Sequence, residues 1–327
     1  MKSTTKKWFT AAGIIIALGI IVGFIAVAAS GFKLSALAFT DNREKHEYEI
    51  DPQDAGELNI KTISSDIILK KSQGANVEIS CYENDNITFD FSVEDDTLKI
   101  EEKDNRKWYE YLLPFVNTND FSLVVALPTD TWNTVNLETT SGDIKTTDIS
   151  GTSFIADSTS GDINLIALHD EKLELNSTSG DITLKSCNNS SINAHSTSGS
   201  LTFDRTTAGE IICESTSGDI CVTNSQDSDS LEASSTSGEV ALENVVARTI
   251  TLESTSGDIE FSKLDSESYD LNTTSGDIDG TIVGSDDSVT FFTDTTSGDV
   301  SVPYPSMGNK TFKATTVSGD IDIRFAK

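Results

Sequence analysis

The residues best suited to chemistry are acidic side chains that recur directly after the glycine of a Thr-Ser-Gly-Asp motif. Two copies carry Ser200 and Glu239 at this position, and the others carry Asp143, Asp162, Asp181, Asp219, Asp258, Asp277, Asp299 and Asp320. Carboxylates stacked at a fixed period repel one another unless a cation or hydrogen-bond donors compensate. Ca²⁺ favours such hard oxygen ligands, so these eight aspartates are candidate calcium ligands.

A structural role explains the same column of residues. An Asp side chain can accept hydrogen bonds from the backbone of its own turn or of the next one. A Ca²⁺ ion needs about six to eight oxygen ligands, and one Asp per repeat without a second acidic column supplies too few. We therefore expect the aspartates to build turns and expect no cofactor, with Ca²⁺ binding as the alternative.

The glycines of the motif mark ten repeats of nearly constant length. Their spacing is 19 to 22 residues, and they are Gly142, Gly161, Gly180, Gly199, Gly218, Gly238, Gly257, Gly276, Gly298 and Gly319. Aliphatic residues stand two positions after every Gly and usually four positions after it, and apolar residues recur seven and usually five positions before it. This alternation predicts two short strands per repeat, each with one buried face.

The Thr-Ser-Gly-Asp corner joins the two strands, and Gly at its third position suits a type II turn, where φ is positive. About ten residues should then return the chain to the next strand. One repeat cannot bury its apolar face alone, so neighbouring repeats must stack at ~4.8 Å per coil. The predicted fold is all-β: a single-stranded parallel β-solenoid of ~19-residue coils over residues 132–327.

Residues 50–131 are expected to form an N-terminal β region that caps the solenoid. Residues 58–69 fit the repeat template with Ser65 in place of Gly, which predicts a degenerate first coil. Alternating runs at 77–81, 87–93, 97–101 and 121–127 predict strands outside the repeat. Solenoids need such terminal units because an end coil otherwise exposes its core.

The N-terminus contains an apolar segment long enough to cross a membrane. Residues 8–29 carry no ionisable side chain, and at ~1.5 Å per residue they would span about 33 Å as a helix. Lys2, Lys6 and Lys7 precede this segment, and only Lys33 follows it closely. The positive-inside rule then predicts a cytoplasmic segment 1–7, a transmembrane anchor 8–30 and a linker 31–49, with the rest outside the cell membrane. A cleaved signal peptide, with residues 36–38 as its small-x-small site, is the alternative.

Charge and cysteine content narrow the class of protein. The chain has 53 acidic and 23 basic residues and a net charge of −30, which excludes nucleic acid and favours cations and basic partners. The four cysteines are scattered through the chain, and Cys213 and Cys221 should face opposite sides of their sheets. We expect all four to be free thiols.

Aromatic residues cluster outside the anchor only at 108–115. Trp108, Tyr109, Tyr111 and Phe115 are candidate contacts for protein or glycan partners, unless this segment folds over the end of the solenoid as a cap. The three histidines, His46, His169 and His195, are isolated, and nucleophile-elbow, zinc and phosphate-loop motifs are absent. The sequence therefore predicts a protein that is not an enzyme and has no catalytic residues.

Several segments together resemble a known family. Residues 63–67 (Ile-Ser-Ser-Asp-Ile), 123–128 and 135–144, with the Ser-Gly-Asp-Ile echoes, make residues 50–327 similar to the bacterial β-strand-repeat family labelled "putative adhesin". The resemblance implies little about mechanism, because the family is largely of unknown function and supplies no catalytic residues. It implies relatives beside cell-envelope stress systems of Gram-positive bacteria.

These observations lead to one functional expectation. The chain is predicted to be a single-pass, membrane-anchored cell-surface protein: an adhesin, or an envelope-associated binding or scaffold protein linked to the envelope stress response. Its expected partners are cell-surface or envelope proteins or glycans, besides the membrane at 8–30. The alternative is a polysaccharide-active β-helix enzyme, an analogy of fold rather than of site.

Overall fold

The computed structural model describes residues 42–52, 55–106, 121–128, 132–226, 228–285, 287–303 and 307–326. The predicted anchor at 8–30 and the aromatic segment at 108–115 lie outside these residues and stay predictions. Over the described ranges, no helix has the length and apolar character needed to span a membrane. Residues 45–104 and 121–327 form one compact unit, and the description below concerns this unit.

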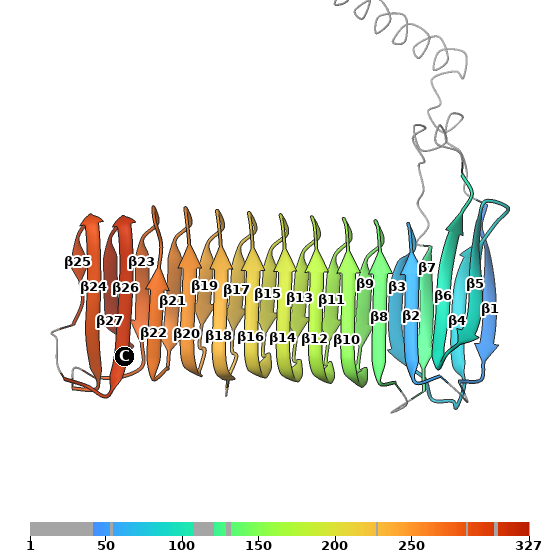
Figure 1. Cartoon of the computed structure of the whole chain (residues 1–327), viewed down its shortest axis with the longest axis horizontal. Coiled ribbons are helices and arrows are strands. Elements are labelled where there is room, and N and C mark those ends of the chain that lie inside the picture. The colour runs from blue at the N-terminus through green and yellow to red at the C-terminus, as the bar shows by residue number, and fades with distance from the viewer. Residues whose placement is uncertain are drawn as a thin grey trace, which may run out of the picture. The chain divides into compact units, whose positions relative to one another are not determined.

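The strands form two sheets that face each other across a core (Figure 1). Sheet A contains, in spatial order, β1 (Glu44–Ile50), β4 (Val77–Glu83), β7 (Ser122–Leu127), β3 (Asp66–Lys71), β9 (Ile144–Thr147), β11 (Ile163–Ile166), β13 (Ile182–Lys185), β15 (Leu201–Asp204), β17 (Ile220–Thr223), β19 (Val240–Glu243), β21 (Ile259–Leu264), β23 (Ile278–Ile282), β27 (Ile321–Phe325) and β25 (Val300–Ser301). Sheet B contains β24 (Val289–Ser297), β26 (Lys310–Ser318), β22 (Ser268–Asn272), β20 (Ala247–Ser254), β18 (Ser228–Ser235), β16 (Thr207–Ser215), β14 (Asn188–Ser196), β12 (His169–Ser177), β10 (Ser150–Ser158), β8 (Thr134–Thr139), β2 (Glu57–Thr62), β6 (Thr97–Asp104) and β5 (Ile87–Glu94).

Each regular coil has a long strand in sheet B, the Thr-Ser-Gly-Asp corner, and a short strand in sheet A. Equivalent residues of successive coils stack in register, as Phe154 does on Leu173 and Ile163 on Ile182. The pairing between successive coils is parallel in both sheets. The predicted parallel β-solenoid of ~19-residue coils is therefore confirmed.

The expected ten-residue return between strands is wrong. After β9 ends at Thr147, β10 begins at Ser150, so a tight second corner replaces the return. Six positions after Gly in the seven regular coils from Gly142 to Gly257, this corner holds a residue in the left-handed region, with φ between 52° and 56°: Asp148, Ala167, Ser186, Arg205, Asn224, Asn244 and Lys263. Non-Gly residues are uncommon there, so propensity gave no signal for this corner.

The predicted reason for the corner glycines is also wrong. None of them has φ in the left-handed region, so the turn does not demand Gly through its dihedral angles. Instead, a Cβ atom added to Gly161 would lie 1.9 Å from the carbonyl oxygen of Gly142 in the neighbouring coil. Gly is required because adjacent corners approach too closely for any side chain.

The core lies between the sheets, and its predicted columns are buried. Ile163 and Leu165 of β11 and Leu173 and Leu175 of β12 are 0% exposed. A further buried column, seven residues after Gly, mixes apolar and small polar side chains: Ile149, Leu168, Cys187, Thr206, Ser225, Val245 and Leu264. The mixed composition hid this column, because periodicity is read from hydrophobic residues.

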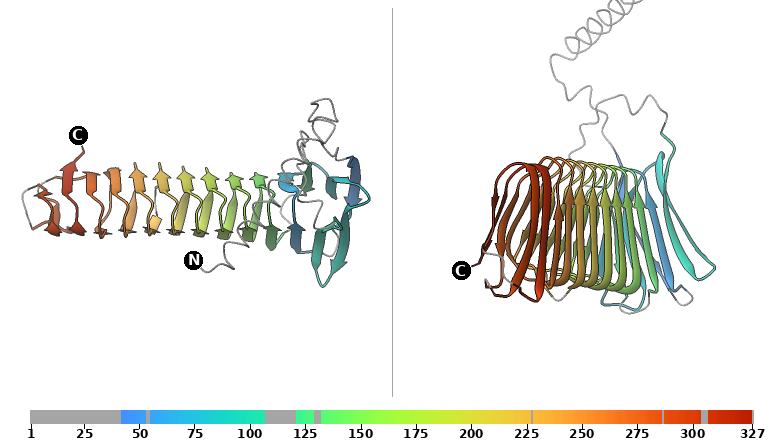
Figure 2. Two further views of the ribbon diagram at one scale, coloured as in Figure 1. Left: turned by 90° about the horizontal axis from the view of Figure 1, so that it is seen from above. Right: turned by 60° about the vertical axis from the view of Figure 1, so that its left-hand side comes forward.

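At the N-terminal end, the chain leaves the stack and later rejoins it. The coil of β2 and β3 pairs directly with β8 and β9, although about 60 residues separate them in sequence. The intervening strands β6 and β7 form the next coil outward, and β5 and β4 pair antiparallel with them. Antiparallel strands thus close this end of the stack (Figure 2).

At the C-terminal end, spatial order departs from chain order. The last coil, β26 and β27, lies between the coil of β22 and β23 and the coil of β24 and β25. The penultimate coil is therefore the outermost one (Figure 1). The chain end is held between two coils rather than left at the free end of the stack.

Candidate functional site

The aspartate column forms a ladder of hydrogen bonds along the edge between the two sheets. The backbone N–H of Asp162 donates to Oδ1 of Asp143 at 3.0 Å, and that of Asp181 donates to Oδ1 of Asp162 at 2.9 Å. The ladder begins at Asp66, which accepts from the Asp143 amide at 2.8 Å, and it recurs at the C-terminal coils. Each carboxylate thus joins its own corner to the next.

Other contacts modify the ladder at particular rungs. Lys145 Nζ lies 3.2 Å from Asp66 Oδ2 and 3.1 Å from Asp143 Oδ2, so its charge compensates two adjacent carboxylates. The backbone N–H groups of Ser200 and Glu239 donate to Oδ1 of Asp181 and Asp219 at 2.8 and 2.9 Å, although these two residues interrupt the run of aspartates. Neutral Ser200 also separates Asp181 from Asp219, which lowers repulsion along the column.

The candidate calcium ligands lie together as one column rather than as separate clusters. Over the described part of the chain, no group of three or more His, Cys, Asp or Glu side chains is placed to hold a metal ion. One oxygen of most carboxylates already accepts an N–H bond. The geometry supports turn building, which is the structural role considered from the sequence.

A buried hydroxyl column completes the corner and was missed from the sequence. Three residues before Gly, Ser or Thr is buried in nearly every coil: Thr139, Ser158, Ser177, Ser196, Ser215, Ser235, Ser254, Thr273 and Thr316. Ser215 Oγ accepts the N–H of Gly218 at 2.9 Å and donates to the carbonyl of Gly199 at 3.3 Å. The signal was available, since aligning the repeats shows Ser or Thr at this position throughout.

A groove runs beside the corners on the outer face of sheet B. Its volume is about 430 Å³ over strands β8 to β14. One wall carries Glu138, Asp157, Asn176 and His195 in successive coils, and the other carries Thr140, Thr159, Thr178 and Thr197. Asn176 Nδ2 donates to Asp157 Oδ1 at 2.8 Å, and His195 Nδ1 lies 3.6 Å from Glu214. The groove offers polar groups at a one-coil repeat.

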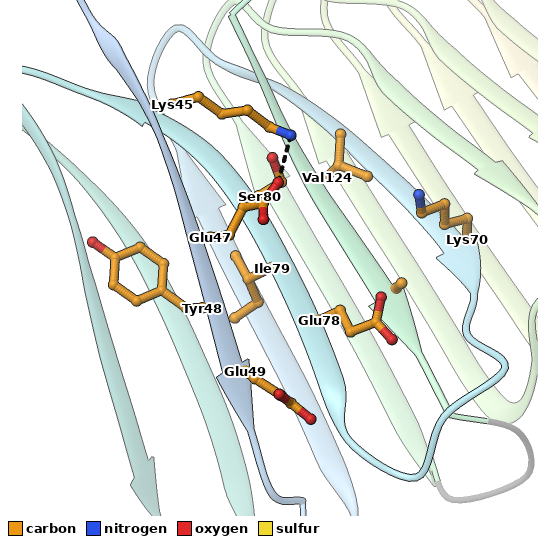
Figure 3. A pocket seen from close by; sticks show the side chains of 10 residues that line it. Lys45, Glu47, Tyr48, Glu49, Lys70, Glu78, Ile79, Ser80 and Val124 are labelled. Carbon is orange, nitrogen blue, oxygen red and sulfur yellow. Dashed lines mark hydrogen bonds and ion pairs between the residues drawn. The ribbon is translucent and has the colours of Figure 1, made fainter.

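A second depression of about 430 Å³ lies on the outer face of sheet A at the N-terminal cap (Figure 3). Lys45 and Lys70 stand on its walls, and Val124 contributes to its floor. Lys45 Nζ lies 2.7 Å from Glu47, and this hydrogen bond raises the pKa of Lys45 and lowers that of Glu47. The depression therefore combines opposite charges over an apolar base.

Tyr48, beside this depression, is engaged with another strand. Its hydroxyl donates to Glu83 Oε2 at 2.6 Å, and this bond, with burial, raises the pKa of Tyr48 to about 12. Its ring packs against Phe91 with centroids 4.7 Å apart. Tyr48 thus ties β1 to β4 and β5.

A third depression, of about 250 Å³, lies on the C-terminal half of the same face of sheet A. Cys221, Glu243, Glu260 and Asp279 line it. Burial raises the pKa of the Cys221 thiol, and the carboxylates of Glu239, Glu243 and Asp204 raise it further. None of the four cysteines forms a disulfide, as predicted, and Cys221 alone among them is partly exposed.

The histidines remain apart in the fold. His46 lies on β1, His169 on β12 and His195 on β14. His46 Nδ1 is 3.9 Å from Glu83 Oε2, at the outer limit of an ion pair. No two of these imidazoles therefore share a site.

The parallel solenoid and its repeated corners define a class of β-strand-repeat proteins. The chain belongs to the Toastrack DUF4097 family, whose sequence model matches residues 55–243 and 185–327. This match confirms the family resemblance drawn from the Ser-Gly-Asp-Ile repeats. No curated protein sequence matches the chain.

Several solved structures align with most of the chain and share little sequence with it. A "putative adhesin" from Parabacteroides distasonis ATCC 8503 is 11% identical, with a TM-score of 0.46 over 86% of this chain and 98% of that one. A "putative adhesin" from Parabacteroides merdae ATCC 43184 is 14% identical, with a TM-score of 0.41 over 89% and 99%. A "putative lipid binding protein" from P. distasonis ATCC 8503 is 18% identical, with a TM-score of 0.42 over 88% and 98%.

Proposed function

We propose that the protein is a membrane-anchored adhesin that binds envelope or cell-surface glycans along the outer face of sheet B. The groove beside the corners carries this proposal, because carboxylate, amide, imidazole and hydroxyl groups repeat there coil by coil. Such side chains hydrogen-bond sugar hydroxyls as donors and acceptors. A linear polymer lying along the stack would meet the same two columns in each successive coil.

The anchor predicted at 8–30 supports the same proposal, because it would hold the rest of the chain outside the cytoplasmic membrane, where glycans are found. Protease added to intact cells should then digest the chain from about residue 42 onward. Digestion only after cell lysis would count against a surface location.

Retention on a glycan is the direct test of the binding function. The full chain in detergent micelles should co-sediment with insoluble peptidoglycan or bind members of a glycan array. The double substitution Asn176→Ala with His195→Ala, inside the groove, should weaken binding about tenfold. Glu260→Ala is the control, since Glu260 is exposed on β21 of the opposite sheet. If the wild-type chain binds no glycan, glycan adhesion is refuted.

The alternatives predict different results in the same assay. A polysaccharide-active enzyme would release new reducing ends from the bound glycan, whereas an adhesin would retain it intact. An envelope-associated scaffold linked to the stress response would bind a co-encoded protein and no glycan. The groove favours the adhesin because it repeats one set of contacts and singles out no acid–base pair.

A further inference from the structure

The outer face of sheet A has a division of charge that the outer face of sheet B lacks. Its outward side chains stand three and five residues after each corner Gly or its equivalent. On β3, β9, β11 and β13 these positions hold three lysines and no carboxylate: Ile68, Lys70, Lys145, Thr147, Asn164, Ile166, Thr183 and Lys185. On β19, β21, β23 and β27 they hold four carboxylates and one arginine: Ala241, Glu243, Glu260, Ser262, Asp279, Thr281, Asp322 and Arg324.

The two central strands of this face separate the charged halves. β15 and β17 present Thr202, Asp204, Cys221 and Thr223. The outer face of sheet B has no such division, because its carboxylates run along its whole length: Glu138, Asp157, Glu174, Glu214, Glu232 and Glu253. On a chain of net charge −30, a basic half-face is unusual and calls for a partner surface that is acidic.

We propose that the outer face of sheet A is a homodimer interface, in which two copies pack antiparallel so that the basic half of one faces the acidic half of the other. A twofold axis parallel to the strands, between β15 and β17, produces this arrangement. It places β9 opposite β23, β11 opposite β21 and β13 opposite β19, as the strand order of sheet A requires.

This axis pairs opposite charges at two positions, and at each end of the face it places Lys70 opposite Arg324, whose charge is paired with Asp322 in its own chain. Lys145 and Asp279 both stand three residues after Gly, on β9 and β23, and so face each other across the interface. Lys185 and Glu243 both stand five residues after Gly, on β13 and β19, and also face each other. Over the described ranges, neither Lys185 nor Glu243 forms an ion pair within its own chain, so both are free to pair with the other copy.

The size of the face predicts a weak dimer. Ten coils at ~4.8 Å, with four-residue strands of ~13 Å, give roughly 620 Å² of flat face per copy. This lies at the lower end of specific interfaces, which usually bury about 800 Å² per partner. The dimer should therefore exchange readily and be best observed by cross-linking.

Cys221 provides a native probe of the predicted axis. It is the one partly exposed cysteine, since Cys81, Cys187 and Cys213 are buried. In the proposed dimer, the two Cys221 residues lie on central strands one coil spacing apart along the stack, across a sheet-to-sheet distance of about 10 Å. A short bismaleimide can bridge the two sulfurs at this separation.

The test is bismaleimide cross-linking of the full chain in the membranes of expressing cells. We expect a covalent species of twice the chain mass that is lost in Cys221→Ser. Lys185→Glu or Glu243→Lys should each lower its yield about tenfold, because two symmetric ion pairs become repulsions. Combining both substitutions restores the pairs with their signs exchanged, and the yield should recover. Glu253→Lys on sheet B, with the same charge change as Glu243→Lys, should leave the yield unchanged.

The proposal is overturned if the wild-type chain gives no cross-linked dimer. This result can be interpreted without any variant, so it does not depend on whether the variants fold. It is also overturned if Glu253→Lys lowers the yield as much as Glu243→Lys, or if the double substitution fails to recover it. Thermal unfolding of each variant shows whether its fold is retained. The inference does not depend on glycan binding, which is placed on the opposite sheet.

Discussion

The backbone amide of Asp162 donates a hydrogen bond to the carboxylate of Asp143, one coil earlier in the stack, at 3.0 Å. This contact links two corners through a side chain, in addition to the backbone pairing within the sheets. A charged acceptor makes such a bond stronger than one between neutral groups. The motif therefore carries Asp after Gly because the next coil needs an acceptor at that point.

Removing one rung should cost a modest amount of stability. Asp181→Ala deprives the Ser200 amide of its acceptor at 2.8 Å, and we expect the free energy of unfolding to fall by about 1 kcal/mol. Asp181→Asn should cost less, because its amide oxygen still accepts the bond and the change removes one charge from the column. Urea unfolding measures both. Equal losses for Ala and Asn would show that the charge, rather than the hydrogen bond, is what matters.

Calcium should not stabilise the fold. We expect the calorimetric unfolding midpoint of the chain to be unchanged by millimolar Ca²⁺, because the aspartates form a single column whose oxygens already serve the corners. A ligand that binds the native state would instead raise the midpoint in proportion to the logarithm of its concentration. Such a rise with Ca²⁺, and not with Mg²⁺, would make the column a calcium site.

The corner glycines should be intolerant of any side chain. A Cβ atom in Gly161→Ala would lie 1.9 Å from the Gly142 carbonyl oxygen, so the two corners would have to separate and their hydrogen bonds would lengthen. We expect a loss of more than about 3 kcal/mol in the free energy of unfolding. Ser160→Ala, one residue earlier and exposed, should change it by less than about 0.5 kcal/mol. Similar stabilities for the two variants would contradict the close approach.

The Glu102 carboxylate should stabilise the N-terminal end of the stack of corners by accepting hydrogen bonds from the backbone N–H groups of the first corner. Its carboxylate is 2% exposed and accepts the N–H groups of Ile63, Ser64 and Ser65 at 2.7, 3.0 and 3.1 Å. In regular coils the preceding corner provides carbonyls for this purpose, as Thr140 does for the Ser160 amide. Glu102→Ala leaves three donors without their acceptor, and we expect a loss of about 3 kcal/mol.

Hydrogen exchange shows where this loss acts. The amides of residues 63–65 should exchange much faster in Glu102→Ala, whereas those of the corner at Gly218 should not. Glu101→Ala is the matched control, because Glu101 is exposed and pairs with Lys103 on the surface. If both variants had equal stability, the carboxylate of Glu102 would have no such structural role.

The repeat made most of the fold predictable from sequence. Gly spacing and alternating apolar columns specify two strands and one corner per coil, and β11 and β12 follow that pattern. The second corner was not predictable, because residues as different as Ala167, Arg205 and Lys263 adopt the same left-handed φ there. Their conformation is imposed by stacking on neighbouring coils rather than by their own preference.

The ends of the stack and the surface sites were harder to foresee. Nothing in the sequence of residues 310–325 indicates where the last coil lies in the stack. This coil, β26 and β27, follows β24 and β25 in the chain, but it lies between them and the coil of β22 and β23. The groove that contains Asn176 and His195 is lined by residues of several successive coils, so it could be located only once the stacking order of the coils was known. The sequence predicted that the aspartates form a column. It could not predict that each carboxylate accepts an N–H bond from the next corner, because that depends on the distance between corners.

The reactivity of Cys221 provides a test of electrostatics on sheet A. Burial raises the pKa of its thiol, and Glu239, Glu243 and Asp204 disfavour the negatively charged thiolate further. Because the thiolate is the reactive form, modification by a disulfide reagent at pH 8 should be slower than for an ordinary exposed thiol, and it should keep accelerating with pH after an ordinary thiol is fully ionised. Cys213, which is buried and whose pKa is raised by burial, should react only on unfolding.

Neutralising one nearby carboxylate should speed this reaction. Glu243→Gln removes a charge that raises the Cys221 pKa, so a larger fraction of the thiol is ionised at pH 8 and the rate should rise severalfold. Glu253→Gln, on the other sheet, removes the same charge without adjoining Cys221 and should leave the rate unchanged. If both substitutions accelerated the reaction equally, the effect would come from the net charge of the chain rather than from the carboxylates around Cys221.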